Sequence, residues 1–466
     1  MNKKLSINVI LAILATGVMT FSGVVVETSM SITFPTLISE FNVGISTVQW
    51  MTTIYLLVLS SIIPLSKFLK NKFKTRNLFV TANVLFIIGL VLDIIAPNFW
   101  LLLMGRFVQG IGTGVALPLM FNIILENVPK ERLGFMMGIG SLITASASAV
   151  GPTFGGVVLS TLGWRYIFVL LIPVLVISLV LGLSTIGKLN NVSEPSESFD
   201  LLSFVLIVLT FAGLILGISG ISHNSLASLT VILPVAVGVV SLFFFVSRQN
   251  SQVSPLLNVK SLKNTSFAKY VFSFFVTQFV TLGLAFIVPN YVQLVNHSSS
   301  TVAGLILLPG AVLGAVISPI SGILLDRLGA KKPIITGVIL IIIPLLVLSI
   351  FTYNLSDRFI TILYTIIMLG VGLSYGNIMT QGLSYLPGEM KADGNAILTT
   401  VQQFSGAIAT VIVSTIIDST IQASSNSETV ATTQGSMYAL MFLLVLTLIQ
   451  VVMIWTTNAK VNEQLN

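Results

Sequence analysis

Apolar segments of membrane-spanning length recur along the whole chain. A transmembrane helix needs about 20 consecutive, mostly apolar residues, and charged or turn-forming residues separate segments of this kind here. Hydrophobic residues make up 55% of the 466 residues and charged residues only 8%, which excludes a soluble globular domain. The segments lack the alternating pattern of a membrane β-barrel. The sequence therefore predicts an all-α, multi-pass membrane protein.

The segments predict fourteen transmembrane helices and their orientation. With the amino terminus inside, 19 of the 22 Lys and Arg residues fall on the inner side, Arg165 and Arg358 lie outside, and Arg106 lies in the membrane. Basic loops face the cytoplasm, so we expect a cell-membrane protein with both termini cytoplasmic. The net charge of +7 then reflects topology and attraction to anionic lipids, without a nucleic-acid partner. The predicted spans are 8–34, 46–66, 77–96, 99–126, 133–160, 165–186, 200–219, 226–247, 266–293, 301–325, 333–352, 357–384, 394–417 and 434–456.

An internal repeat divides the chain into halves. Residues 64–77 and 319–333 are similar basic connections, and eight predicted helices separate them, so both face the same side. This spacing predicts a six-helix bundle over 1–187, two additional helices with linkers over 188–263, and a second six-helix bundle over 264–466. Paired halves with a site near the membrane midplane are typical of alternating-access transporters.

Glu27 lies inside an uncharged run over residues 5–38. A carboxylate in hydrocarbon is costly unless it faces a cavity or a partner, which makes Glu27 a candidate proton site. Burial favours the protonated carboxyl and a cationic ligand favours the ionised one, so one site can exchange a proton for a cation. The alternative is a glutamate held permanently by Arg106 or by hydroxyl groups. Thr16, Thr20, Gly23 and Ser31 share its predicted helix face.

Arg106 is the only basic residue deep within a predicted span, and Gln109 shares its helix face. We expect it to face the bundle and to couple proton occupancy to helix position; the alternative is a structural ion pair. Glu126 ends the fourth predicted helix and is either a second proton site or a solvated helix end. Three aspartates are expected to be caps or hydrated carboxylates at outer helix ends. They are Asp93, Asp357 and Asp418.

No metal centre or cofactor is expected. The sequence has no cysteine, which excludes disulfides and thiolate metal sites. Its two histidines, His223 and His297, fall in predicted outer loops and are not expected to be ligands.

Motifs in three regions carry a resemblance to a known family. They are the loop at 322–332, the Arg-Phe-Val-Gln-Gly-Ile-Gly segment at 106–112, and the Gly-Pro-Thr-Phe-Gly-Gly segment at 151–156. Their order and spacing resemble the major facilitator superfamily over nearly the whole chain, and within it the fourteen-helix drug:proton antiporters. The resemblance implies two six-helix bundles with two extra helices. Glu27 lies one place after the usual first-helix aspartate of that family.

The resemblance also implies gating residues. Asp326 and Arg327 match a cytoplasmic latch, whereas Asn71 stands where the family has an aspartate in the other repeat. This departure implies a weaker or differently wired latch in the amino half. Gly151 and Pro152 would kink the fifth helix into a tight seam that hinders leak; the alternative is ordinary packing of small residues.

The drug contacts are predicted only as polar residues that face a central cavity. Phe272, Phe275 and Phe279 would add aromatic surface. The alternative for each polar candidate is a contact between helices. The candidates are Tyr55, Gln109, Gln278, Asn290, Tyr291, Asn377, Gln381 and Gln402.

Taken together, these features predict a proton-coupled antiporter that exports amphipathic cationic or zwitterionic drugs, with Glu27 as the proton acceptor. We expect a monomer whose partners are drugs, protons and membrane lipids, and no enzymatic activity. Export of a lipid or an endogenous metabolite, or monovalent cation/proton antiport, is the alternative. A channel or a sensor fits less well, because the sequence has neither a filter-like repeat nor a soluble output domain. It also has no phosphate-binding loop for an ATP-driven pump.

Overall fold

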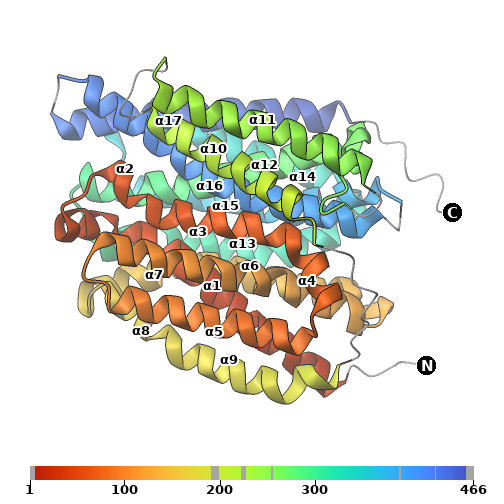
Figure 1. Ribbon diagram of the computed structural model, residues 1–466. Coiled ribbons are helices and arrows are strands. Elements are labelled where there is room, and N and C mark those ends of the chain that lie inside the picture. Colours follow the sequence, from red (N-terminus) through yellow and green to blue (C-terminus); the bar gives the residue numbers. More distant parts are fainter. Residues whose placement is uncertain are drawn as a thin grey trace. The chain divides into compact units, whose positions relative to one another are not determined.

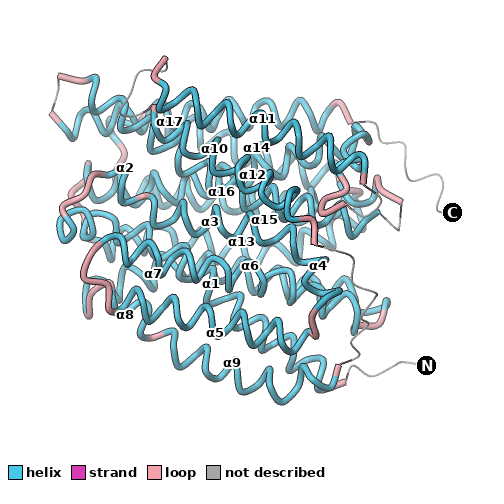
Figure 2. The backbone as a smooth tube through the Cα atoms, in the orientation of Figure 1, coloured by secondary structure: helices cyan, strands magenta, loops and turns pink. Residues whose placement is uncertain are grey.

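The computed structural model describes residues 6–189, 199–221, 227–252, 255–387, 390–425 and 427–457. These ranges contain helices and no strands (Figures 1 and 2). Thirteen helices in them are long and apolar enough to cross a membrane, and the shorter apolar helix Trp50–Leu65 coincides with the second predicted span. The all-α membrane fold is therefore confirmed.

Two units make up the structure, and the first comprises Met1–Phe204 and Ser299–Leu308. Its central helix is α1, which packs against α6, α7 and α9, while α5 packs against α6 and α9. The helices of this unit are α1 (Ile7–Phe41), α2 (Ile45–Val48), α3 (Trp50–Ile62), α4 (Ser66–Lys72), α5 (Thr75–Ile94), α6 (Phe99–Asn127), α7 (Lys130–Thr161), α8 (Arg165–Val169) and α9 (Leu171–Thr185), with 3-10 turns η1 (Ile63–Leu65) and η2 (Ile186–Lys188).

Local sequence explains where several of these helices begin and end. Asn42 adopts a left-handed conformation (φ 53°) that ends α1, and Asn is one of the few residues that tolerate this conformation. The Asn98 side chain accepts a hydrogen bond from the Leu101 N–H at 3.0 Å and caps the start of α6. The sixth predicted span is broken into α8 and α9, because Pro173 has no N–H to bond the carbonyl of Val169.

The second unit comprises Val205–Ser298 and Pro309–Asn466. Its central helix is α12, which packs against α15, α16 and α17. The helices are α10 (Leu201–Gly220), α11 (Leu229–Ser251), α12 (Thr265–Leu294), α13 (Ser300–Leu328), α14 (Lys331–Ile350), α15 (Asp357–Ser384), α16 (Lys391–Ala423) and α17 (Glu428–Trp455), with 3-10 turns η3 (Val259–Lys263) and η4 (Thr352–Asn354).

The two additional helices, α10 and α11, cross with their backbones in close approach. A Cβ atom added to Gly213 would lie 2.6 Å from the Pro234 carbonyl oxygen and 2.7 Å from the Gly238 nitrogen, so only glycine allows this crossing. The Phe211 ring of α10 stacks on the Phe404 ring of α16, with centroids 4.6 Å apart. Most of this pair groups with the second unit, and the predicted boundaries at 187 and 264 stay a prediction.

Helix α13 contributes to both units. Residues up to Leu308 group with the first unit and residues from Pro309 group with the second. In the first unit, Thr153 of α7 donates to the Gly304 carbonyl at 3.1 Å. A Cβ atom at Gly304 would lie 2.6 Å from the Pro152 carbonyl oxygen. The first turns of α13 therefore lie against the backbone of α7.

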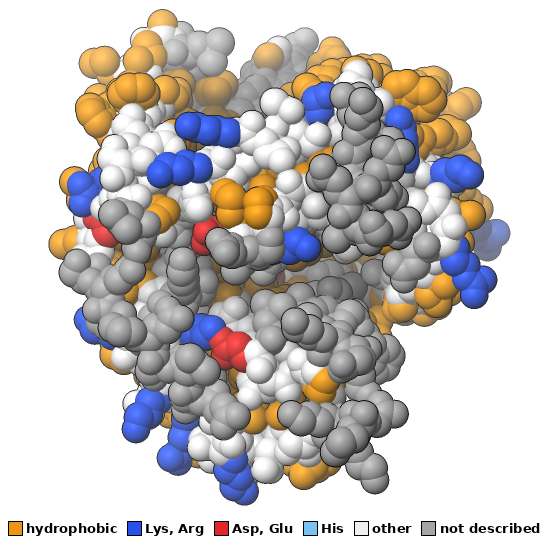
Figure 3. Space-filling view, turned by 90° about the vertical axis from the view of Figure 1, so that its right-hand side faces the viewer, with side chains coloured by type: hydrophobic (Ala, Val, Ile, Leu, Met, Phe, Trp, Pro, Cys, Tyr) orange, Lys and Arg blue, Asp and Glu red, His pale blue; other side chains and the backbone are white. Residues whose placement is uncertain are grey.

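Lysines stabilise the carboxyl end of α17. Lys269 of α12 donates to the Thr456 carbonyl at 3.1 Å, and Lys331 of α14 donates to the Trp455 carbonyl at 3.2 Å. These are terminal carbonyls with no partner inside the helix, and positive charge is favourable there. Figure 3 shows a face with many Lys and Arg side chains.

Candidate functional site

Arg106 of α6 is fully buried inside the first unit. Its Nε donates to the Met51 carbonyl of α3 at 3.1 Å, and its Nη1 donates to Gln109 Oε1 at 2.6 Å. The guanidinium carbon lies 4.3 Å from the centre of the Tyr55 ring. The guanidinium group is thus held between α3 and α6 and does not extend toward lipid.

Asp93 of α5 joins this cluster through Gln109. The Gln109 Nε2 donates to Asp93 Oδ2 at 2.6 Å, and both side chains are completely buried. Asp93 lies in the last turn of α5 as expected, but the expectation that its carboxylate is hydrated or caps the helix is wrong. The reason is the close packing of α5 on α6: an added Cβ atom at Gly105 would overlap Asp93 Oδ1, and one at Gly89 would lie 2.7 Å from the Gly105 carbonyl oxygen.

Glu27 of α1 lies beside this cluster and is 8% exposed. Its carboxyl group lies within electrostatic range of the Arg106 guanidinium. Within the ranges that the structure describes, neither a hydrogen bond nor an ion pair within 4.0 Å holds the Glu27 carboxylate. Both oxygens of the Glu27 carboxylate are therefore free to accept a hydrogen bond, whereas Asp93 Oδ2 already accepts one from Gln109.

Tyr55 connects the cluster to α1. Its hydroxyl group donates to the Gly23 carbonyl at 3.0 Å and shares a hydrogen bond with the Thr113 hydroxyl at 2.8 Å. These bonds occupy the Tyr55 hydroxyl, and the ring is occupied by Arg106. In the structure Tyr55 is a contact between α1, α3 and α6, and its predicted drug contact stays a prediction.

Five buried polar atoms in or next to α1, α3 and α6 have no hydrogen-bond partner within the described residues. A buried polar group without a partner costs about 1–3 kcal/mol, so such groups are candidates to bind a ligand or a proton carrier. They are Thr20 Oγ1, Gln49 Oε1, Thr52 Oγ1, Thr53 Oγ1 and Arg106 Nη2.

Glu126, the other predicted proton site, lies apart from these residues at the end of α6. It forms an ion pair with Lys70 of α4, and its side chain is 26% exposed. The ion pair joins the last turns of α4 and α6. The side chains of Asn71 and Asp326 lie outside the described residues, and Arg327 is exposed in the last turn of α13.

Gly151 and Pro152 lie in the contact between α7 and α1. Helix α7 continues through Pro152, and Ser29 of α1 donates to the Gly151 carbonyl at 2.7 Å. A Cβ atom at Gly155 would lie 2.8 Å from the Ser29 carbonyl oxygen. These residues form the close seam that their motif predicts, and their gating role stays a prediction.

The predicted drug contacts in the second unit fall into two groups. Asn290 donates to a carbonyl one turn earlier in α12 at 2.7 Å, Tyr291 donates to the Thr352 carbonyl at 2.5 Å, and Asn377 donates to the Ser321 carbonyl at 3.2 Å. All three side chains are buried. The Tyr291 and Asn377 bonds link α12 to η4 and α15 to α13, whereas the Asn290 amide bonds its own helix.

Three glutamines form the other group. Gln278, Gln381 and Gln402 are half-buried, and their amide groups make no hydrogen bond within the part of the chain that the structure describes. They lie on α12, α15 and α16, which pack against one another. Their amides are therefore free to contact a ligand.

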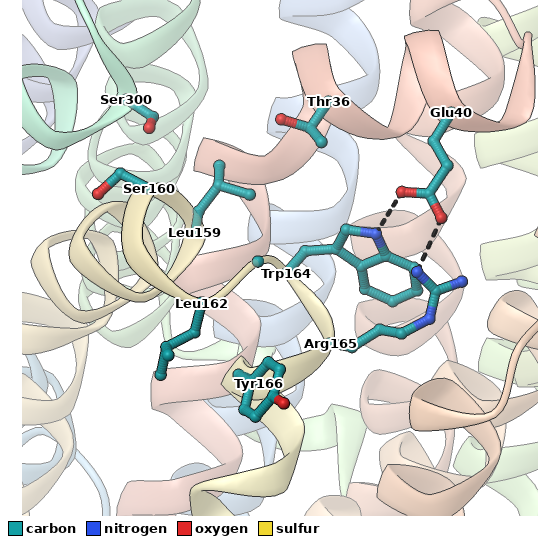
Figure 4. A pocket seen from close by; sticks show the side chains of 10 residues that line it. Thr36, Glu40, Leu159, Ser160, Leu162, Trp164, Arg165, Tyr166 and Ser300 are labelled. Atoms are coloured by element: carbon teal, nitrogen blue, oxygen red, sulfur yellow. Dashed lines mark hydrogen bonds and ion pairs between the residues drawn. The ribbon is translucent and has the colours of Figure 1, made fainter.

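A pocket of about 500 Å³ lies where the ends of α1 and α7 meet the start of α8 (Figure 4). Glu40 accepts hydrogen bonds from Trp164 Nε1 at 2.7 Å and from Arg165 Nη1 at 2.8 Å. The Arg165 guanidinium also stacks on the Trp164 ring, 4.1 Å from its centre. Glu40, Trp164 and Arg165 thus bond one another and join the end of α1 to the start of α8. These contacts indicate a structural role for the pocket more clearly than a binding site. Its other lining residues include Thr36, Ser160, Tyr166 and Ser300.

Comparison with known proteins places this arrangement in a family. The lincomycin resistance protein LmrB of Bacillus subtilis (strain 168) is 36% identical over 395 residues, which cover 84% of this chain and 82% of that protein. The multidrug resistance protein B homolog of Mycobacterium tuberculosis (strain ATCC 25618 / H37Rv) is 28% identical over 397 residues, covering 84% of this chain and 73% of that protein.

Solved structures support the same fold. The crystal structure of a D-xylose-proton symporter aligns with a TM-score of 0.66 at 15% identity, covering 96% of this chain and 97% of that chain. At this identity the likeness concerns the fold alone. Residues 11–410 match the family described as the Major Facilitator Superfamily. This chain therefore belongs to the Major Facilitator Superfamily of membrane transporters.

Proposed function

We propose that this transporter exports amphipathic, cationic or zwitterionic drugs from the cytoplasm in exchange for protons. Its membership of the superfamily makes it a multi-pass transporter, not an enzyme. Relatives named for lincomycin resistance and multidrug resistance at 28–36% identity support drug efflux. The observation that supports proton coupling is the Glu27 carboxylate. It is buried beside a fixed guanidinium, and among the described residues it has no hydrogen-bond or ion-pair partner.

In this proposal Glu27 carries the exchanged proton. A protonated Glu27 is neutral and suits its apolar surroundings, whereas a bound cation favours the ionised carboxylate. Proton and drug then compete for one group. Because Arg106 is held by Met51 and Gln109, it stays in place while the charge on Glu27 changes. This competition links proton uptake to drug release in an alternating-access cycle.

Other residues would bind the drug or set the balance of states. We assign drug contacts in the second unit to Gln278, Gln381 and Gln402, whose amides are free. The ion pair of Lys70 with Glu126 would serve as the inner latch of the amino half, where Asn71 replaces the family's aspartate. Asp326 and Arg327 would serve the carboxyl half. The proposal includes cytoplasmic termini and a monomer.

Transport by purified protein in liposomes tests this proposal. With an imposed pH gradient, we expect wild-type protein to accumulate lincomycin against its concentration gradient and Glu27→Gln to lose this uphill transport, because the amide keeps the volume but cannot exchange a proton. Glu428→Gln, at an exposed position in the first turn of α17, is the matched control. Uphill transport at wild-type rates by the Glu27 variant would refute the assignment. Proton release on adding Na⁺ or K⁺ without drug would instead favour cation/proton antiport.

A further inference from the structure

Asp93 is a buried carboxyl group that proton exchange at Glu27 does not use. It lies on α5 and none of its surface is exposed. Its Oδ2 accepts a hydrogen bond from Gln109, and its Oδ1 has no partner among the residues that the structure describes. An acidic group this deep in the first unit costs free energy unless a positive charge compensates it.

The Gln109 amide places that positive charge within reach. An amide has an acceptor end and a donor end, and here the carbonyl oxygen accepts from Arg106 at 2.6 Å while the NH2 group donates to Asp93 at 2.6 Å. Both bonds are short, as bonds to charged groups are. Gln109 therefore connects the Arg106 guanidinium to the Asp93 carboxyl group through two directed hydrogen bonds.

The seam that contains Asp93 is closed. Glycines at 89, 105 and 112 bring the two backbones together: added Cβ atoms at Gly89 and Gly112 would each lie 2.7 Å from a carbonyl oxygen of the facing helix. Both helices belong to the first unit, so a rearrangement of the two units leaves this seam intact. Asp93 has no exposed surface, whereas Glu27, although buried, is 8% exposed, so of the two carboxyl groups Glu27 has the better access to a transported proton.

The helices around Asp93 contribute several other ionisable groups. Helix α6 contributes Arg106, α3 contributes Tyr55 and α1 contributes Glu27, while α9 has no ionisable residue. Helix α8 contributes Arg165, which bonds Glu40 and the Ala96 carbonyl. The basic residues of α4 and η2 lie at the ends of those elements, and the charged residues of α7 lie in its first turn. Arg106 is the charge connected to Asp93.

We propose that Asp93, acting through Gln109, is the permanent counter-ion of Arg106, and that it leaves Glu27 free to bind and release the transported proton. Asp93 is a positioning residue and does not itself touch the drug or exchange the proton. Without it, Glu27 would be the nearest carboxylate to Arg106 and would be held in its ionised form. This inference rests on the proposed role of Glu27.

Asp93→Asn tests the proposal, because asparagine can still accept the Gln109 hydrogen bond but has no charge. The measurement is the pH dependence of lincomycin-induced proton release by purified protein. We expect its midpoint to move to lower pH by about one unit or more, the usual effect of an opposite charge nearby. Lincomycin binding at neutral pH should persist while uphill transport slows, which a merely structural defect would not produce.

Two further variants serve as a control and as an independent test. Asp357→Asn, which removes a carboxylate that accepts from Asn296 at 2.7 Å and Ser298 at 2.6 Å in the second unit, should not move the midpoint. Gln109→Met cuts the connection with both charges in place and should shift the midpoint in the same direction; it also supplies the test if Asp93→Asn does not fold.

The Glu27→Gln background separates this proposal from the proposed function. Lincomycin binding in that background should show no further pH shift when Asp93→Asn is added, since Asp93 acts through the charge on Glu27. A remaining shift would mean that Asp93 carries a proton itself, and no shift in the otherwise wild-type protein would mean that it does not influence Glu27. Either result would overturn the inference. Active uphill transport by Glu27→Gln alone would instead refute the proposed function.

Discussion

Replacing Arg106 by lysine tests whether the shape of the guanidinium group matters as well as its charge. Arg106 uses two different nitrogens to bond the Met51 carbonyl at 3.1 Å and Gln109 at 2.6 Å, and its plane lies over the Tyr55 ring. One ammonium nitrogen cannot occupy both positions. We therefore expect Arg106→Lys to be nearly as damaging as Arg106→Ala.

The contacts of Arg106 indicate how large the loss on substitution by lysine should be. A hydrogen bond to a charged group contributes about 1.5–3 kcal/mol, and a buried cation over an aromatic ring contributes about 0.5–2 kcal/mol. Loss of one such bond and part of the stacking amounts to about 2–4 kcal/mol, or about 30- to 700-fold at roughly 1.4 kcal/mol for each factor of ten. The proposed uphill drug transport should fall by this factor in liposomes, with thermal unfolding measured in parallel. A fully active lysine variant would show that the site needs only a positive charge.

Two further substitutions test packing and burial. Gly105→Ala should lower the stability of the first unit by about 1–3 kcal/mol, because the new methyl group overlaps Asp93 Oδ1. Gly376→Ala is the control and should be tolerated, because no atom lies within 4 Å of its added methyl group. Equal thermal unfolding of the two variants would contradict the close packing of α5 on α6. Asp418→Asn should raise the unfolding temperature, because Asp418 is only 6% exposed and has no hydrogen-bond or ion-pair partner in the described ranges of the chain, so that removing the charge lowers the cost of burial. A lower unfolding temperature would mean that the carboxylate has a stabilising partner.

The sequence predicted the features that depend on how apolar and charged residues are distributed along the chain. All fourteen predicted spans correspond to helices, because long apolar runs in a bilayer have few alternatives to a helix. Glu27 and Arg106 stood out for the same reason, as charges inside such runs. The break between α8 and α9 was missed although Pro173 marks it, since a proline can also kink a helix without ending it.

The contacts between helices were harder to predict. The sequence suggested that Asp93 lies at a hydrated helix end, and it did not establish which face of α5 lies against α6. The glycines at 89 and 105 were a signal, because small residues allow helices to approach closely. Only the structure pairs them and places Asp93 beside Gln109. The Lys70 partner of Glu126 likewise depends on how α4 meets α6.

The division of α13 between the two units affects how this chain can be dissected. A fragment that ends in the 190–198 linker would contain the helices α1 to α9 but lack the ten residues Ser299–Leu308 that belong to the first unit. It would expose the Pro152 carbonyl and Thr153, which those residues cover. Split versions of this transporter, made for expression trials or complementation, should therefore be produced as two co-expressed pieces, because the first piece alone lacks part of its own packing surface.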